Sequence, residues 1–179
     1  MRLNSPARRA AFGGVLTALI VVCLIAAAYL PAGRLGFYFI AAFLPVTAIA
    51  EGRRGLAALC ATAACALALL ILPDKLAILP YACILAYYAV LRDLFSATGR
   101  ILGKLLQLLC FNAGLLLWGI LLVNLFGLSP AEFFPIEMTT LLWVLFAVAA
   151  QIAFLLLDYL FGLVCEYYVE RLKPRLFHK

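Results

Sequence analysis

Six apolar runs, separated by short polar or turn-forming segments, follow one another along the chain. A helix that crosses a membrane needs about 20 mostly apolar residues, and most of these runs approach that length. Proline and glycine, which end helices, stand in the breaks, as at Pro31 and Gly33 or at Gly52 and Gly55. We therefore expect an all-α polytopic membrane protein, a bundle of six transmembrane helices at about residues 10–30, 35–50, 56–72, 76–91, 105–126 and 139–165.

Three of these runs have features of their own. The second contains Pro45, which a membrane helix tolerates when a neighbour pairs with the carbonyl group that proline frees. The fourth is short and rich in tyrosine, and the polar connection 92–104 that follows it has room for a small interfacial helix. The first run follows Arg8 and Arg9, as a signal peptide would, but its length and the runs after it favour a retained helix.

The composition narrows the class of protein. The 179 residues are 68% hydrophobic and 12% charged, with a mean hydropathy of +1.16. Soluble domains are about 45–50% apolar and about 25% charged, and disordered segments are poor in apolar residues, so both classes are excluded. We expect a transmembrane domain over residues 1–165. The remaining residues 166–179 form a basic amphipathic cytoplasmic tail whose composition favours contact with anionic lipid.

The basic residues are distributed unequally between the two sides that six spans define. Twelve of the fourteen Lys and Arg residues fall in the N-terminus, the second and fourth connections and the C-terminal tail, whereas Arg34 and Lys75 fall on the other side. Cytoplasmic connections are enriched in Lys and Arg. We therefore expect both termini in the cytoplasm and a multi-pass protein of the plasma or inner membrane. This distribution accounts for the net charge of +6 without a nucleic-acid partner.

Residues that carry enzyme or metal chemistry are scarce in this chain. The six cysteines all lie within apolar runs, none in a CxxC pair, and buried cysteine behaves as a small hydrophobic residue. The only histidine is His178, and no Gly-rich phosphate loop or carboxylate pair accompanies it. The sequence therefore predicts no catalytic residue, no metal site and no cofactor, and a protein that is not an enzyme.

A few polar side chains fall inside the predicted spans. Asp158 is the only acid well inside a span and precedes Glu166 by about two helical turns, which places it about 12 Å inside the cytoplasmic end. Ionisable residues at membrane depth mark function by default. The alternatives are a hydrogen-bonded packing cluster, a proton or ion relay, and a contact with a partner. The full set of intramembrane polar residues is Gln107, Asn112, Gln151 and Asp158.

A second set of polar and aromatic residues gathers near the predicted outer face. Apolar walls, aromatic faces and a few charges are what a small-molecule pocket needs, although Trp and Tyr also belt ordinary membrane helices. Arg34 and Lys75 are exceptions to the enrichment of basic residues on the cytoplasmic side, and together they could bind an anionic carboxylate or phosphate. The predicted substrate-binding residues are Arg34, Tyr38, Lys75, Tyr81, Trp118 and Asn124, with Glu132 and Trp143 nearby.

The first predicted helix carries small residues at four-residue spacing. Such a stripe allows close approach of another helix, either within the chain or from a partner. The residues predicted to dock on a partner are Ala7, Ala11, Gly14 and Ala18.

A basic N-terminus, the Ala7/Ala11 stripe, six spans in 179 residues and the Gly52/Gly55 hairpin together resemble the substrate-binding S components of energy-coupling factor (ECF) transporters. The resemblance covers nearly the whole chain in layout. It implies that the first helix docks on a coupling transmembrane subunit that works with ATPases, and that a vitamin or metal site opens to the outside. On this basis Ala7 and Ala11 would contact the partner, and Arg34 and Lys75 would line the site of the nutrient.

Two other functions fit the same sequence. A scaffold or assembly protein of a cell-envelope complex, without a ligand, would recruit partners through its basic connections and tail. Small multispan proteins of cell-shape complexes have a similar layout. A secondary transporter or membrane enzyme would use an intramembrane charge such as Asp158, but no internal repeat is visible.

Overall fold

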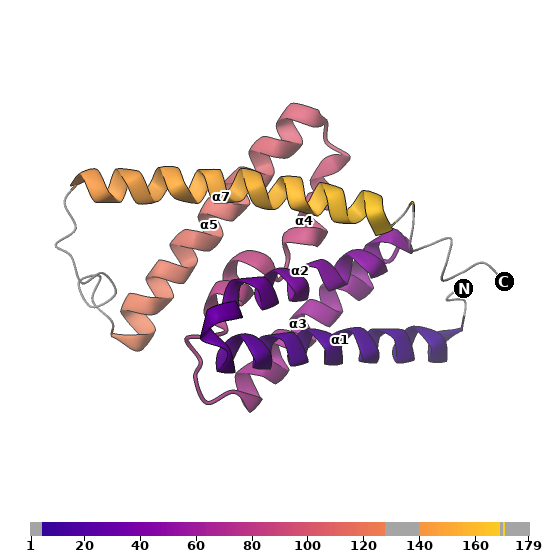
Figure 1. The fold of residues 1–179 in the computed structure, drawn as a ribbon. Helices are drawn as coiled ribbons and strands as arrows, with labels where there is room; N and C mark the ends of the chain where they lie inside the picture. The colour runs from indigo at the N-terminus through magenta and orange to yellow at the C-terminus, as the bar shows by residue number, and fades with distance from the viewer. Residues whose placement is uncertain (1–4, 128–139, 169, 171–179) are drawn as a thin grey trace.

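The computed structural model describes residues 5–127, 140–168 and 170, and helices account for nearly all of them. The π-helical segment η2 (Tyr81–Leu85) and the short 3-10 helix η1 (Pro31–Gly33) join longer elements, and the described residues contain no strand. The α-helices are α1 (Pro6–Tyr29), α2 (Arg34–Ala50), α3 (Arg54–Ile71), α4 (Tyr88–Ser96), α5 (Arg100–Phe126) and α7 (Thr140–Tyr167). Figure 1 shows their arrangement. The all-α prediction holds for the described part of the chain.

Four helices are long and apolar enough to cross a membrane: Pro6–Tyr29, Arg54–Ile71, Ile101–Phe126 and Val144–Tyr167. The 17-residue α2 is a shorter apolar helix, at the lower limit of about 17 residues for a span. Many large apolar side chains point outward, with Leu70 80% and Ile101 79% exposed. An apolar surface of this extent indicates a membrane protein, because in water it would drive aggregation.

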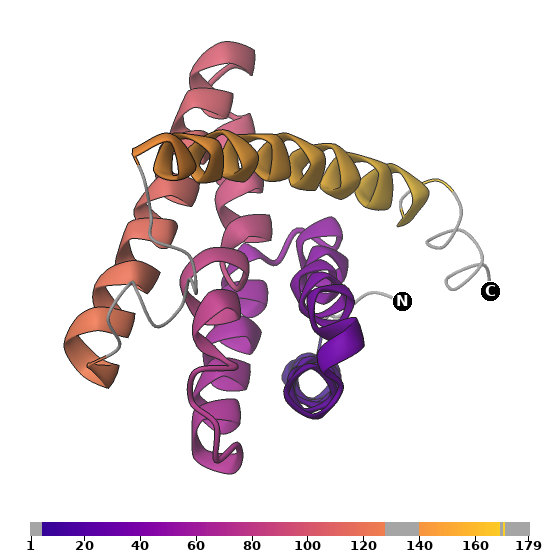
Figure 2. The same cartoon turned by 60° about the vertical axis from the view of Figure 1, so that its left-hand side comes forward.

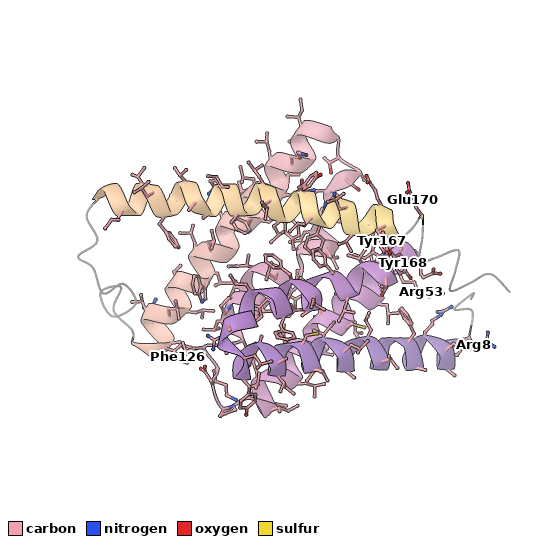
Figure 3. The ribbon with its side chains drawn as sticks, viewed as in Figure 1. Arg8, Arg53, Phe126, Tyr167, Tyr168 and Glu170 are labelled. Atoms are coloured by element: carbon pink, nitrogen blue, oxygen red, sulfur yellow. The ribbon has the colours of Figure 1, made fainter. Side chains whose placement is uncertain are left out.

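α1, α2 and α7 run between two ends of the molecule, whereas α4 and α5 are steeply inclined to them (Figure 1). Figure 3 places Arg8, Arg53 and Tyr167 at one end and Phe126 at the other. We call the first the basic end, since Arg54 lies next to Arg53 there and forms an ion pair with Asp93 of α4. We call the second the opposite end. Among the described basic residues, only Arg34 and Lys75 belong to the opposite end, where α1 and α3 finish. The sequence-derived charge asymmetry therefore corresponds to two physical ends of the fold.

The helices form layers rather than a closed ring. α1, α2 and α3 lie side by side, α4 and η2 pack between α2 and α5, and α7 crosses over α2 (Figures 1 and 2). Figure 2 shows α5 on the far side of α4 from α1. The core consists largely of small and aromatic residues, and its largest fully buried side chains include Tyr81 and Phe161. One face of most helices is thus left for lipid or for another protein.

The fourth predicted span differs from the observed structure. One helix over 76–91 and a polar connection over 92–104 are not observed. Residues 79–85 are helical and include the π-helical segment, a turn at 86–87 leads into α4, and only 97–99 separate α4 from α5. The π-helical bond runs from the Ala86 N–H to the Tyr81 carbonyl at 2.8 Å. The predicted interfacial helix is therefore wrong. Its polar residues Arg92 and Asp93 lie on α4, where they form ion pairs with other helices.

Glycine allows α5 to approach the discontinuous segment closely. A Cβ atom at Gly114 would lie 2.6 Å from the Cys83 carbonyl oxygen, and one at Gly103 would lie 2.5 Å from the Phe95 carbonyl oxygen. Both distances are shorter than any ordinary contact of a Cβ atom, so backbone packs directly on backbone here. This contact fixes the position of α4 against the first half of α5.

Pro45 lies inside α2 without ending it, and its missing N–H leaves the Ala41 carbonyl without its helical partner. The Tyr81 hydroxyl, 0% exposed, donates to this carbonyl at 3.4 Å. The expectation that a neighbour pairs with the freed carbonyl is thus met by a residue of η2.

Candidate functional site

The described charges that reach furthest into the bundle surround the carboxylate of Asp158 on α7. Arg92 of α4 donates from Nε to Oδ1 at 3.0 Å, and Lys104 of α5 lies 3.6 Å from Oδ2. The Tyr88 hydroxyl donates to Oδ1 at 3.2 Å. The Asp158 side chain is only 13% exposed, whereas that of Lys104 is 67% exposed. Three helices therefore meet at one carboxylate near the basic end, and we call these four residues the Asp158 cluster.

Neighbouring groups hold Arg92 in place. The Gln107 amide is 3.5 Å from the Arg92 carbonyl oxygen, and the Arg92 guanidinium is 3.8 Å from the Cys165 sulfur. The guanidinium also lies beside Gly162, where an added Cβ atom would be 3.4 Å from it, an ordinary van der Waals contact. The side chain of Arg92 thus spans from α4 to α7.

A cavity of about 370 Å³ opens beside the Asp158 cluster at the basic end. Its walls come from the end of α2, from α4, from the first turns of α5 and from α7. The polar lining comprises Arg92, Asp93, Ser96, Lys104, Gln107 and Asp158. Asp93 forms an ion pair with Arg54 of α3, so each acid of the lining has a basic partner.

The other two residues of the predicted intramembrane set form a separate pair. Asn112 of α5 and Gln151 of α7 exchange two amide hydrogen bonds, at 2.9 and 3.3 Å. Such reciprocal bonding satisfies both amides and fastens the two helices together. Of the four residues predicted from the sequence, the structure brings Asn112 to Gln151 and places Gln107 and Asp158 on the same cavity.

Sequence reasoning missed Tyr88, Arg92 and Lys104 as partners of Asp158. The sequence places Arg92 and Lys104 in a polar connection, because they bound the polar stretch between the fourth and fifth apolar runs. A signal was present, since Tyr88 and Arg92 are four residues apart and therefore share a helix face if the helix continues past Leu91.

The two basic residues of the predicted outer site bind helix carbonyls. Arg34 donates from Nε to the Ala27 carbonyl at 3.1 Å, near the end of α1. Lys75 donates to the Leu72 carbonyl at 2.6 Å and also to that of Leu69, at the end of α3. Basic side chains commonly satisfy the last carbonyls of a helix in this way. This accounts for both cations at the opposite end without an anionic ligand.

The aromatic residues of that predicted site have structural partners too. Tyr38 and Tyr81 are buried, with ring centroids 6.5 Å apart. The Tyr38 hydroxyl donates to the Ala77 carbonyl, as that of Tyr81 does to Ala41. These bonds join α2 to the segment that precedes α4.

Trp118 and Asn124 lie on α5, away from the charged cavity lining. The Asn124 amide donates to the Ile120 carbonyl of its own helix at 2.9 Å and is exposed. The Trp118 indole N–H is buried without a hydrogen-bond partner among the described residues. Glu132 and the side chain of Trp143 lie outside the described part of the chain.

The small residues of α1 face outward. Ala7, Ala11, Gly14 and Ala18 are all exposed, and nothing lies within 4 Å of a Cβ atom added at Gly14. The neighbouring Gly13 is buried, and an added Cβ would lie 3.1 Å from the Leu56 side chain of α3. An apolar groove of about 420 Å³ runs between α1 and α3 along this face.

The start of the predicted tail packs against the basic end. Tyr168 is buried, and Figure 3 places it beside Tyr167 and near Arg53. Burial raises the pKa of the Tyr168 hydroxyl, with a further contribution from the Glu51 carboxylate. Residues 171–179, which hold most of the tail's charge and His178, lie outside the described residues.

Among the described residues, no group of His, Cys, Asp and Glu side chains is arranged to hold a metal ion. Comparisons with protein-family models, curated proteins and solved structures find no match to this chain. The resemblance to the S components of ECF transporters therefore stays a prediction, and the functional argument rests on the geometry of the chain itself.

Proposed function

We propose that this protein is a membrane subunit that captures a small nutrient and passes it to a coupling transmembrane subunit linked to ATPases, as S components of ECF transporters do. In this proposal the chain crosses the plasma or inner membrane six times, with the four long helices, α2 and the segment 79–96 as spans. The basic end then faces the cytoplasm with both termini, in agreement with the enrichment of Lys and Arg there.

The observation that carries the proposal is the uncovered small-residue face of α1. In a bundle that packs alone, small residues are most useful where helices touch, as Gly13 does against α3. Ala7, Ala11, Gly14 and Ala18 instead face outward beside an apolar groove. A second helix from another protein would approach closely along this face.

The nutrient would bind in the outer half of the bundle. Of the predicted residues there, Trp118 has the one buried donor that no described group uses. Arg34 and Lys75 would have to release the carbonyls at the ends of α1 and α3 before binding an anion. A neutral or weakly polar ligand that accepts a hydrogen bond from the indole N–H therefore fits this half better than a strong anion.

The test compares variants of the α1 face after affinity purification of the full-length chain from its native membranes. Gly14→Leu and Ala18→Leu fill the face without any clash inside the bundle, and Ala153→Leu fills an exposed position on α7 as the matched control. We expect the native chain and Ala153→Leu to recover a transmembrane subunit and ATPases, and both α1 variants to lose them. Equal recovery by all four proteins would refute the docking face.

A ligand screen tests the capture step separately. We expect the purified protein to gain thermal stability with a vitamin-like compound, and Trp118→Phe to lose most of that gain. A screen without any stabilising compound would count against nutrient capture.

The alternative, a scaffold of a cell-envelope complex, is favoured by one observation. Both outer cations and both buried tyrosines of the predicted substrate site are bonded within the fold. Recovery of cell-envelope proteins instead of ATPases in the same purification would support this function.

A further inference from the structure

The ion pairs at the charged cavity join three basic residues to two acids, which leaves a surplus of one positive charge. Asp158 is shared by Arg92 and Lys104, so one carboxylate neutralises only one of two cations. Asp93 is already neutralised by Arg54. One positive charge thus remains at the wall of a cavity that no described side chain fills. Lys104 carries it most freely, since its side chain is 67% exposed and its distance to Asp158 is 3.6 Å.

The backbone at the cavity wall also contributes partial positive charge. Gly99 and Gly103 line the cavity, and Gly99 precedes the first residue of α5, whose N-terminus has no side-chain cap. Gly99 has φ of +115°, a conformation that a residue with a side chain rarely adopts. This position therefore favours glycine, which has no side chain to cap the N–H groups of α5. The first turn of a helix presents unpaired N–H groups and a partial positive charge. These donors add to the cations Arg92 and Lys104.

The size and position of the cavity limit the kind of anion. A volume of about 370 Å³ is at the lower end of the range for ligand pockets, about 300–1,000 Å³, and exceeds the needs of a single water molecule. Beside it, Ile101, Leu102 and Leu105 on the first turns of α5 are 79%, 52% and 56% exposed. A polar cavity next to outward-facing apolar side chains matches the boundary between lipid headgroups and acyl chains.

We propose that this cavity binds a phosphate group, carried either by the headgroup of an anionic phospholipid or by a small phosphorylated solute. Lys104 and the guanidinium of Arg92 face the phosphate, and Asp158 holds Arg92 in the orientation that this requires. The proposal does not depend on a docking partner or on nutrient capture, because no residue that lines this cavity belongs to the small-residue face of α1 or to the predicted substrate site.

The test uses the full-length protein and two variants that each remove one positive charge from the basic end. Lys104→Gln changes the cavity, and Arg8→Gln changes an exposed residue of α1 outside it. Native mass spectrometry measures retention of phosphatidylglycerol against a glycolipid that lacks phosphate. A thermal-shift titration with glycerol phosphate measures the soluble source.

We expect preferential retention of phosphatidylglycerol and a loss of about fivefold in Lys104→Gln, which corresponds to about 1 kcal/mol per basic residue at a membrane surface. Arg8→Gln should retain it as the native chain does. Stabilisation by glycerol phosphate in the native chain, lost in Lys104→Gln, would support the same site with a soluble ligand. The proposal would be overturned if the native chain retained both lipids equally and glycerol phosphate did not stabilise it. It would also be overturned if Lys104→Gln and Arg8→Gln lost phosphatidylglycerol to the same extent.

Discussion

Replacing Gly114 by alanine places a methyl group against the backbone of the π-helical segment. The new Cβ atom would lie 2.6 Å from the Cys83 carbonyl oxygen and 3.4 Å from the Ile84 Cα atom. Ordinary van der Waals contact begins at 3.4 Å, so α5 and η2 would have to separate. Neither partner is a flexible side chain, and the strain is therefore shared by two backbones.

The magnitude follows from two opposing effects. Overpacking costs about 1–3 kcal/mol, and a clash with fixed backbone belongs at the upper end of that range. Alanine raises the intrinsic stability of a helix by about 1 kcal/mol relative to glycine. We expect Gly114→Ala to lower the free energy of unfolding by about 2 kcal/mol, the difference between these two terms.

Gly119 supplies the matched control, because it lies on the same helix and nothing is within 4 Å of an added Cβ atom. Gly119→Ala should gain up to about 1 kcal/mol, since only the propensity term applies. Reversible unfolding in detergent–lipid mixtures, followed by circular dichroism, compares the two variants. If Gly114→Ala proved as stable as Gly119→Ala, the close packing of η2 on α5 would be refuted.

Three further experiments, with four substitutions, test the polar groups. Tyr81→Phe removes the donor to the Ala41 carbonyl, and we expect a loss of about 1–2 kcal/mol in the same unfolding assay. A double-mutant cycle with Asp158→Asn and Arg92→Gln should give a coupling energy of about 1.5 kcal/mol, near the maximum found within membranes. Because burial raises the pKa of Tyr168 in the folded protein, stability falls as the pH rises from about 10 through that raised pKa, and Tyr168→Phe should reduce the fall in alkaline unfolding measurements.

Each of these predictions has a control in the chain. Tyr159→Phe removes the hydroxyl of a tyrosine that is 67% exposed and should change stability little. Asp158→Asn combined with Arg8→Gln should show no coupling, because Arg8 lies at the start of α1 away from the cavity lining. Tyr167 is 56% exposed, so Tyr167→Phe should leave the alkaline loss of stability unchanged. If the Tyr81→Phe protein were as stable as the native chain, the hydrogen bond of the Tyr81 hydroxyl would not stabilise α2 at Pro45.

The helix positions followed closely from the apolar runs wherever a run had a clear break at each end. Arg34–Ala50 and Arg54–Ile71 agree with the predicted runs 35–50 and 56–72 to within two residues. The fourth run was harder, because its π-helical segment depends on tertiary contacts. The Tyr81 hydroxyl donates to a carbonyl of α2, and Gly114 of α5 leaves room for the Cys83 carbonyl. The hydrophobic periodicity of a single segment predicts neither of these tertiary contacts.

The polar contacts were only partly predictable. The sequence predicts that Asp158 lies well inside a span, but it places Arg92 and Lys104 in a connection, because charged residues between apolar runs usually face water. Arg34 and Lys75 stood out by position alone, and a ligand was one explanation. The structure supplies another, since each reaches back to carbonyls of the helix that precedes it. Basic residues shortly after a helix end are a signal for such capping.

Cysteine labelling from the two sides of the membrane tests the proposed topology most directly. In a variant without the native cysteines, Arg53→Cys reports on the basic end and Asp74→Cys on the connection after α3 at the opposite end. We predict that a membrane-impermeant maleimide labels Asp74→Cys on intact cells and labels Arg53→Cys only after permeabilisation. Labelling of both positions from the same side would contradict the six-span arrangement. Labelling of Arg53→Cys alone on intact cells would show that the orientation in the membrane is the reverse of the one proposed.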